Sequence, residues 1–159
     1  MKKIIRLIIA ISFLSYICAL IVLLFFLSRG FWSGMPLMEY IRYSSNFVPF
    51  KTINGYVVSI SNVSMNLDIP IKNLAGNVAA FLPMGFFLPY YFRKLYRLKT
   101  FTITMTVMIL SVEVIQLVTR RGSFDIDDYI LNIIGALLGL GIWKAVTALR
   151  ARKNAVSAQ

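Results

Sequence analysis

The stretch "RRGSFDIDDYILNIIGALLGLG" (residues 120–141) decides the fold, because it joins a charged turn directly to an apolar segment. It holds three of the six acidic residues of a chain that is 58% hydrophobic. Asp128, Asn132, Gly135 and Gly139 follow one another at steps of three or four, which places them on one face of a helix. The stretch therefore predicts a helix that enters an apolar medium with one polar, glycine-lined face.

The rest of the chain has the hydropathy of a membrane protein. Its 159 residues suit one domain, but a mean hydropathy of +0.75 is too high for a soluble one. A spanning helix needs about twenty apolar residues. We therefore expect an all-α membrane protein, a single domain over residues 1–159. Its four transmembrane helices are expected at residues 4–27, 71–92, 101–118 and 129–149, and a disordered tail at residues 150–159.

The first segment has a second interpretation. It begins with a basic residue pair, Lys2 and Lys3, as a cleaved signal peptide does. Its apolar run is about twice the length of a signal core, which favours a membrane anchor.

The positive charges indicate an orientation. The formal net charge is +11, and eleven of the seventeen Lys and Arg residues lie near residue 1, between residues 93 and 99, or after residue 143. These places fall on one side of a four-helix topology, so the positive-inside rule puts both termini in the cytoplasm. The basic charge then follows from membrane topology, and we expect no nucleic-acid partner.

Residues 28–70 are expected to form an outer interfacial loop between the first two spans. The segment is too irregular for a spanning helix, and it is rich in aromatic residues, which suit the headgroup level of a membrane. The aromatic residues are Phe31, Trp32, Tyr40, Tyr43, Phe47 and Phe50.

Nearly all polar residues inside the predicted spans fall near the outer side. Asn73 and Asn77 share a face of the second span, and Glu113, Gln116 and Arg120 share a face of the third. A carboxylate in mid-helix costs about 2.5–3.5 kcal/mol, so Glu113 must be paired, protonated or exposed to water. Two hypotheses follow: three polar faces converge on a small outward-facing pocket, with Arg120 and Arg121 as partners of Glu113, or the polar residues only hold the helices together.

Proline and glycine predict a bend and close packing. Pro83 lacks an amide hydrogen and is followed at once by Gly85, so a kink is expected in the second span. Gly135 and Gly139 let another helix approach closely, either within the bundle or in a second copy of the chain. The sequence alone predicts no oligomeric state.

Four motifs in order resemble the VanZ-like family of membrane proteins associated with teicoplanin resistance. They are "NFVPF" in the loop, "NVAAFLPMG" in the second span, "EVIQ" in the third and "FDIDDYILNIIGALLG" entering the fourth, and they cover residues 46–139. The matching residues are Asn46, Pro49, Phe50, Asn77, Phe81, Pro83, Gly85, Glu113, Gln116, Asp125, Asp127, Asp128, Asn132, Gly135 and Gly139. The resemblance implies a multi-pass protein of the bacterial cytoplasmic membrane, linked in some members to lower susceptibility to lipid-anchored glycopeptides. It implies no settled reaction.

The available side chains limit the chemistry. The chain has no histidine and a single cysteine, Cys18, so a His-based relay is excluded, and no nucleophile motif is present. No resident cofactor or metal is expected. The carboxylates of Asp125, Asp127 and Asp128, which we call the acidic turn, nevertheless suit Mg²⁺ or Ca²⁺. Arginines suit a phosphate. Asp125 or Asp127 could instead cap the start of the last helix.

Three functions therefore compete. The favoured one binds or moves the headgroup of a phosphorylated lipid or a polyprenyl-linked wall precursor. The second is an intramembrane hydrolase or transferase acting on a lipid phosphate, with Glu113, Asp127 and Asp128 as candidate catalytic residues. The third is a structural or regulatory membrane subunit. The candidate binding residues are Asn77, Glu113, Gln116, Arg120, Arg121, Asp125, Asp127, Asp128 and Asn132.

Overall fold

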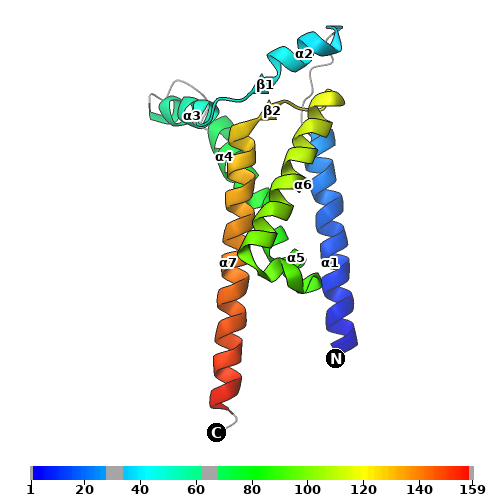
Figure 1. Ribbon diagram of the computed structural model, residues 1–159, viewed down its shortest axis with the longest axis vertical. Helices are drawn as coiled ribbons and strands as arrows, with labels where there is room; N and C mark the ends of the chain where they lie inside the picture. The colour runs from blue at the N-terminus through cyan, green and yellow to red at the C-terminus, as the bar shows by residue number, and fades with distance from the viewer. Residues whose placement is uncertain (1, 28–33, 62–67, 158–159) are drawn as a thin grey trace. The chain divides into compact units, whose positions relative to one another are not determined.

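The computed structural model describes residues 2–27, 34–61 and 68–157, and these ranges are predominantly helical (Figure 1). Four of the described helices are long and apolar enough to cross a membrane: Lys3–Leu27, Asp68–Tyr91, Leu98–Val118 and Ile126–Val156. They coincide with the four segments expected from hydropathy, so the predicted all-α membrane fold is confirmed. The orientation with both termini inside remains a prediction, and Phe31 and Trp32 lie outside the described residues.

The chain divides into two compact units, Met1–Phe47 with Ser111–Asp125, and Val48–Leu110 with Ile126–Gln159. The first unit begins with α1 (Lys2–Val22), which continues into the π-helical turn η1 (Leu23–Leu27). Within Lys3–Leu27 only Leu20 is buried. A helix that is apolar on nearly all sides and exposed along its length is suited to contact with lipid.

A short parallel strand pair joins distant parts of the first unit. The helix α2 (Leu37–Tyr43) leads into β1 (Ser45–Asn46), which pairs with β2 (Phe124–Asp125) (Figure 1). In this register Ser45 lies opposite Phe124 and Asn46 lies opposite Asp125. The unit is completed by the C-terminal part of α6 (Leu98–Val118).

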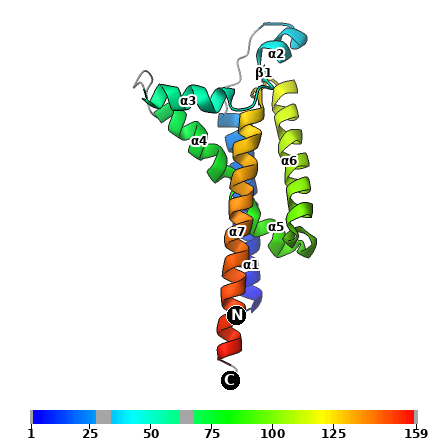
Figure 2. The same cartoon turned by 60° about the vertical axis from the view of Figure 1, so that its left-hand side comes forward.

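The second unit is built around the longest helix, α7 (Ile126–Val156). The helices α4 (Asp68–Phe81) and α5 (Met84–Tyr91) pack along α7, and α3 (Lys51–Ser61) lies across the direction of α7 in both views (Figures 1 and 2). After α5 the chain forms the 3-10 helix η2 (Arg93–Tyr96) and enters α6. The N-terminal part of α6 presents one fully buried stripe, Phe101, Met105 and Ile109, at the four-residue spacing of a helix face.

The second span is interrupted where proline and glycine led us to expect a kink. The helix α4 ends at Phe81, and α5 begins at Met84 with Pro83 as its N-cap. Proline suits the start of a helix because its missing amide hydrogen has no intrahelical acceptor there. The amides of Phe86 and Phe87 both donate to the Pro83 carbonyl, at 3.0 Å. Movement at this interruption remains a prediction.

The C-terminal tail differs from its prediction. The helix α7 continues to Val156, and Ser157 N donates to Lys153 O at 3.0 Å, so residues 150–156 are helical and not disordered. Hydropathy marks only the apolar part of a helix, whereas Ala, Arg and Lys all have high helix propensity. Cations near a helix C-terminus also interact favourably with the helix dipole.

Candidate functional site

In the first unit, the "NFVPF" motif is joined to the acidic turn. Asn46 Nδ2 donates to Asp125 Oδ1 at 3.0 Å, and Phe124 N donates to Ser44 O at 2.9 Å. The rings of Phe47 and Phe124 lie 5.0 Å apart, within the range of favourable aromatic pairs. Two motifs separated by nearly eighty residues in sequence therefore form one local structure.

Glu113 is held against the same turn. Its side chain is 4% exposed, and Oε2 accepts a hydrogen bond from Asp125 N at 3.4 Å. Asp125 is itself buried, at 9% exposure. We call Asn46, Glu113, Gln116 and Asp125 the Glu113 cluster. It brings two carboxylates together near the C-terminal end of α6.

Gln116 links the cluster to the first span. Its Nε2 donates to Leu24 O at 2.7 Å, and Leu24 belongs to the π-helical turn η1. A π-helical turn changes the spacing of backbone hydrogen bonds in a helix, and such turns are frequent at functional sites. Sequence reasoning missed Leu24, because a backbone carbonyl leaves no trace in the side-chain pattern.

The end of α6 fixes the two arginines. Arg121 N donates to Gln116 O at 2.8 Å and Arg120 N to Leu117 O at 3.1 Å, which is the Schellman pattern of helix termination. Arg120 occupies the left-handed position with φ of 56°, where glycine is usual. The helix therefore ends at a defined point, and both arginines are placed by the backbone.

Both guanidinium groups lie over aromatic rings. Arg120 Cζ is 5.9 Å from the Tyr40 ring centroid, and Arg121 Cζ is 5.8 Å from that of Phe26. Tyr40 is anchored in turn, since its hydroxyl donates to Gly122 O at 2.8 Å. A cation over an aromatic face is favourable by about 0.5–1 kcal/mol at exposed sites. An interaction between these arginines and Glu113 remains a prediction.

In the second unit, Asp127 caps a helix other than its own. The side chain is fully buried; Oδ1 accepts from Phe50 N at 2.5 Å, and Oδ2 accepts from Thr52 N and Ile53 N at 2.7 and 3.1 Å. Thr52 and Ile53 belong to the first turn of α3, and Phe50 directly precedes it and has no side-chain acceptor for a cap. Asp127 therefore caps the start of α3, and capping of the last helix by Asp125 or Asp127 remains a prediction.

The polar faces of α4 and α7 meet directly. Asn77 Nδ2 donates to Asp128 Oδ1 at 2.5 Å. One helical turn further along α7, Asn132 is 3% exposed, and its Oδ1 has no hydrogen-bond partner among the described residues. Two of the three predicted polar faces therefore come together in this unit. Convergence with the Glu113 face, and the pocket it would form, remain predictions.

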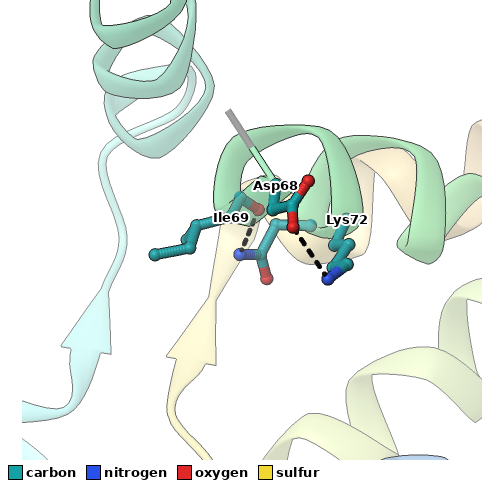
Figure 3. A network of polar contacts seen from close by, with 4 residues as sticks. Asp68, Ile69 and Lys72 are labelled. Carbon is teal, nitrogen blue, oxygen red and sulfur yellow. Dashed lines mark hydrogen bonds and ion pairs between the residues drawn. The ribbon is translucent and has the colours of Figure 1, made fainter. Parts of the chain in front are cut away.

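Asn73 does not join this contact. It is exposed, and its Nδ2 donates to Ile69 O at 3.0 Å within the same helix. Next to it, Lys72 Nζ and Asp68 Oδ2 form an exposed ion pair at 3.5 Å (Figure 3). The start of α4 is therefore a polar surface. Of the predicted pair, the Asn77 side chain hydrogen-bonds to α7, and the Asn73 side chain bonds within α4.

The glycines bring α7 into backbone contact with α4 and α5. A Cβ at Gly135 would overlap Val78 O, a Cβ at Gly139 would overlap Leu82 O, and a Cβ at Gly85 would overlap the backbone of α7. Of the two packing hypotheses for Gly135 and Gly139, the structure shows packing within the bundle.

The carboxylates of Asp125, Asp127 and Asp128 were the expected ligands for a divalent cation, and binding of a cation there remains a prediction. No group of three or more Asp, Glu or Cys side chains comes together in the part of the chain that the structure describes. All three carboxylates accept hydrogen bonds from amides.

Fold and site together define a multi-pass α-helical integral membrane protein whose long first connection is tied to the start of its last span. Residues 13–148 match the VanZ/LLP1 family model, and the chain belongs to this family. Protein VanZ of Enterococcus faecium is 27% identical over 109 residues, which cover 69% of this chain and 58% of the relative. The match thus spans little more than half of that relative. No solved structure matches the chain.

Proposed function

We propose that the protein binds the polar headgroup of a phosphorylated, membrane-anchored envelope precursor at the Glu113 cluster, and thereby lowers susceptibility to teicoplanin. The observation that carries this proposal is a pair of buried carboxylates, Glu113 and Asp125, in the same unit as Arg120 and Arg121. A buried carboxylate within a spanning helix is costly and typically marks a functional position.

The chemistry of the cluster suits such a headgroup. Guanidinium groups bind phosphate oxygens through paired, charge-assisted hydrogen bonds. Carboxylates accept hydrogen bonds from the hydroxyl and ammonium groups that wall precursors carry. Arg120 and Arg121 would therefore bind the phosphate, while Glu113 would bind the polar groups beyond it.

The family supports the resistance phenotype. The chain belongs to VanZ/LLP1, and one relative bears the name Protein VanZ. The VanZ-like family is linked in some members to lower susceptibility to glycopeptides with a lipid anchor. A protein that holds a membrane-anchored precursor alters what such an antibiotic meets at the membrane surface.

Glu113→Gln tests the proposal, because it preserves the shape of the side chain and removes its charge. Bacteria that express the wild-type chain should tolerate more teicoplanin than the empty-vector strain, and the E113Q strain should lose this difference at equal membrane abundance. Glu39→Gln is the matched control, since Glu39 is an exposed carboxylate of the same unit. Full protection by E113Q would refute the assignment of Glu113.

A structural membrane subunit is the second candidate. It is favoured by the contacts of Asp127, which serve to hold α3. If this were the whole role of the polar residues, E113Q would lower the amount of folded protein in step with protection. The hydrolase hypothesis loses its candidate Asp127, because three backbone amides already engage that carboxylate.

A further inference from the structure

The loop between α5 and α6 carries a basic cleft that belongs to none of the polar contacts described above. Arg93, Lys94, Arg97 and Thr100 line a cleft of about 360 Å³, and all four are exposed. The sequence contains no Asp or Glu from residue 69 to residue 112. In the described ranges none of the three cations has a carboxylate partner. The cleft therefore carries uncompensated positive charge and suits an anion.

The loop is held in place by α7. The Tyr96 hydroxyl lies 3.1 Å from Thr147 Oγ1, and Lys144 Nζ lies 5.2 Å from the centroid of the Tyr96 ring. Leu95, between the cations, is buried. Arg93 and Lys94 thus lie on a 3-10 turn, and Arg97 is its C-cap. The contacts of Tyr96 and the burial of Leu95 hold the backbone of this turn before any ligand arrives.

An apolar groove continues from the basic cleft. Arg93, Lys94 and Thr100 also line a groove of about 720 Å³, whose other lining residues are mainly apolar. These are Leu88, Tyr91, Phe92, Leu95, Thr104 and Met108. Because cleft and groove share three residues, they form one site with a charged end and an apolar end. An inorganic anion would use only the charged end.

We propose that this site binds an anionic phospholipid, with its phosphate on Arg93, Lys94 and Arg97 and an acyl chain along the groove. Arginine suits a phosphate through its paired donors, and the Thr100 hydroxyl supplies a further donor. Basic pockets between transmembrane helices bind phospholipid headgroups in this way. The site shares no residue with the Glu113 cluster, so it does not rest on the proposed function.

Lipid retention by the purified full-length protein tests the charged end. In native mass spectrometry the wild type should retain phosphatidylglycerol in preference to phosphatidylcholine. R93Q/K94Q/R97Q should weaken phosphatidylglycerol binding roughly a hundredfold, since three surface cations are removed. The matched control is R150Q/R152Q/K153Q, which removes three exposed cations from the end of α7. Equal binding by the two triple variants would overturn the proposal.

A second pair of variants tests the apolar end. Thr104→Phe fills the groove and should weaken phosphatidylglycerol binding at least tenfold. Ile103→Phe places the same ring on the exposed face of α6, where Ile103 is 55% exposed, and should leave binding unchanged. If T104F binds like I103F, or if millimolar inorganic phosphate displaces phosphatidylglycerol, the site holds an anion without an acyl chain and the proposal is wrong.

Discussion

Replacing Asp127 by Asn should release the start of α3. The wild-type carboxylate accepts three amide hydrogen bonds, one at Oδ1 and two at Oδ2. The Asn side chain has one acceptor oxygen. If that oxygen serves Thr52 and Ile53, its amino group faces the Phe50 amide, which then loses its acceptor. One hydrogen bond to a charged acceptor contributes about 1.5–3 kcal/mol, so opening of this turn should become roughly tenfold to a hundredfold more frequent.

Hydrogen–deuterium exchange in lipid nanodiscs measures this opening directly. Peptides that cover residues 48–61 should exchange faster in D127N by that factor, provided that exchange follows the opening equilibrium. Asp68→Asn is the control, since Asp68 pairs with Lys72 in an exposed ion pair, and such pairs contribute about 0–1 kcal/mol. Wild-type exchange at residues 50–53 in D127N would refute the assignment of Asp127 as the cap of α3.

Two further predictions concern the packing of α7. Gly139→Ala should lower the thermal unfolding temperature in detergent, because its Cβ would overlap Leu82 O. Such overpacking costs about 1–3 kcal/mol. The control Gly141→Ala, whose Cβ meets no atom within 4 Å, should leave the unfolding temperature unchanged. A double-mutant cycle of Asn77→Ala and Asp128→Ala should give a coupling of about 1.5–3 kcal/mol, as for a hydrogen bond to a charged group. Additive effects would show that the two side chains do not interact.

The spans and the glycine face could be predicted because both depend on local sequence. Hydropathy over about twenty residues locates a spanning helix, whatever it packs against. The spacing of Gly135 and Gly139 marks a helix face that can approach another backbone. The structure adds that the partners of these glycines are the carbonyl oxygens of Val78 and Leu82.

The contacts of the acidic turn could not be predicted in the same way. Asp127 binds backbone amides 74 to 77 residues away in sequence, and every residue except proline has such an amide. One signal was available, because α3 begins after Pro49 and Phe50, neither of which can cap a helix through its side chain. A helix start without a capping side chain leaves its first amides open to water or to an acceptor from elsewhere in the fold.

Asn73 and Asn77 share a helix face by spacing, but their side chains make different contacts for a physical reason. Two residues four apart share a helix face, but sharing a face does not place both against a neighbour. Asn73 is exposed near the start of α4, and its side-chain amide donates a hydrogen bond to the carbonyl of Ile69. Asn77, one turn later, reaches Asp128.

Binding of a polyprenyl phosphate to the purified protein in nanodiscs tests the central proposal most directly. It is best measured in the R93Q/K94Q/R97Q background, which removes the proposed phospholipid site between α5 and α6. There R120Q/R121Q should weaken binding roughly thirtyfold, because two partly exposed cations are lost. The control R150Q/R152Q removes two cations from the end of α7 and should bind as its parent does. Equal affinity of R120Q/R121Q and R150Q/R152Q for the polyprenyl phosphate would contradict headgroup binding beside the Glu113 cluster.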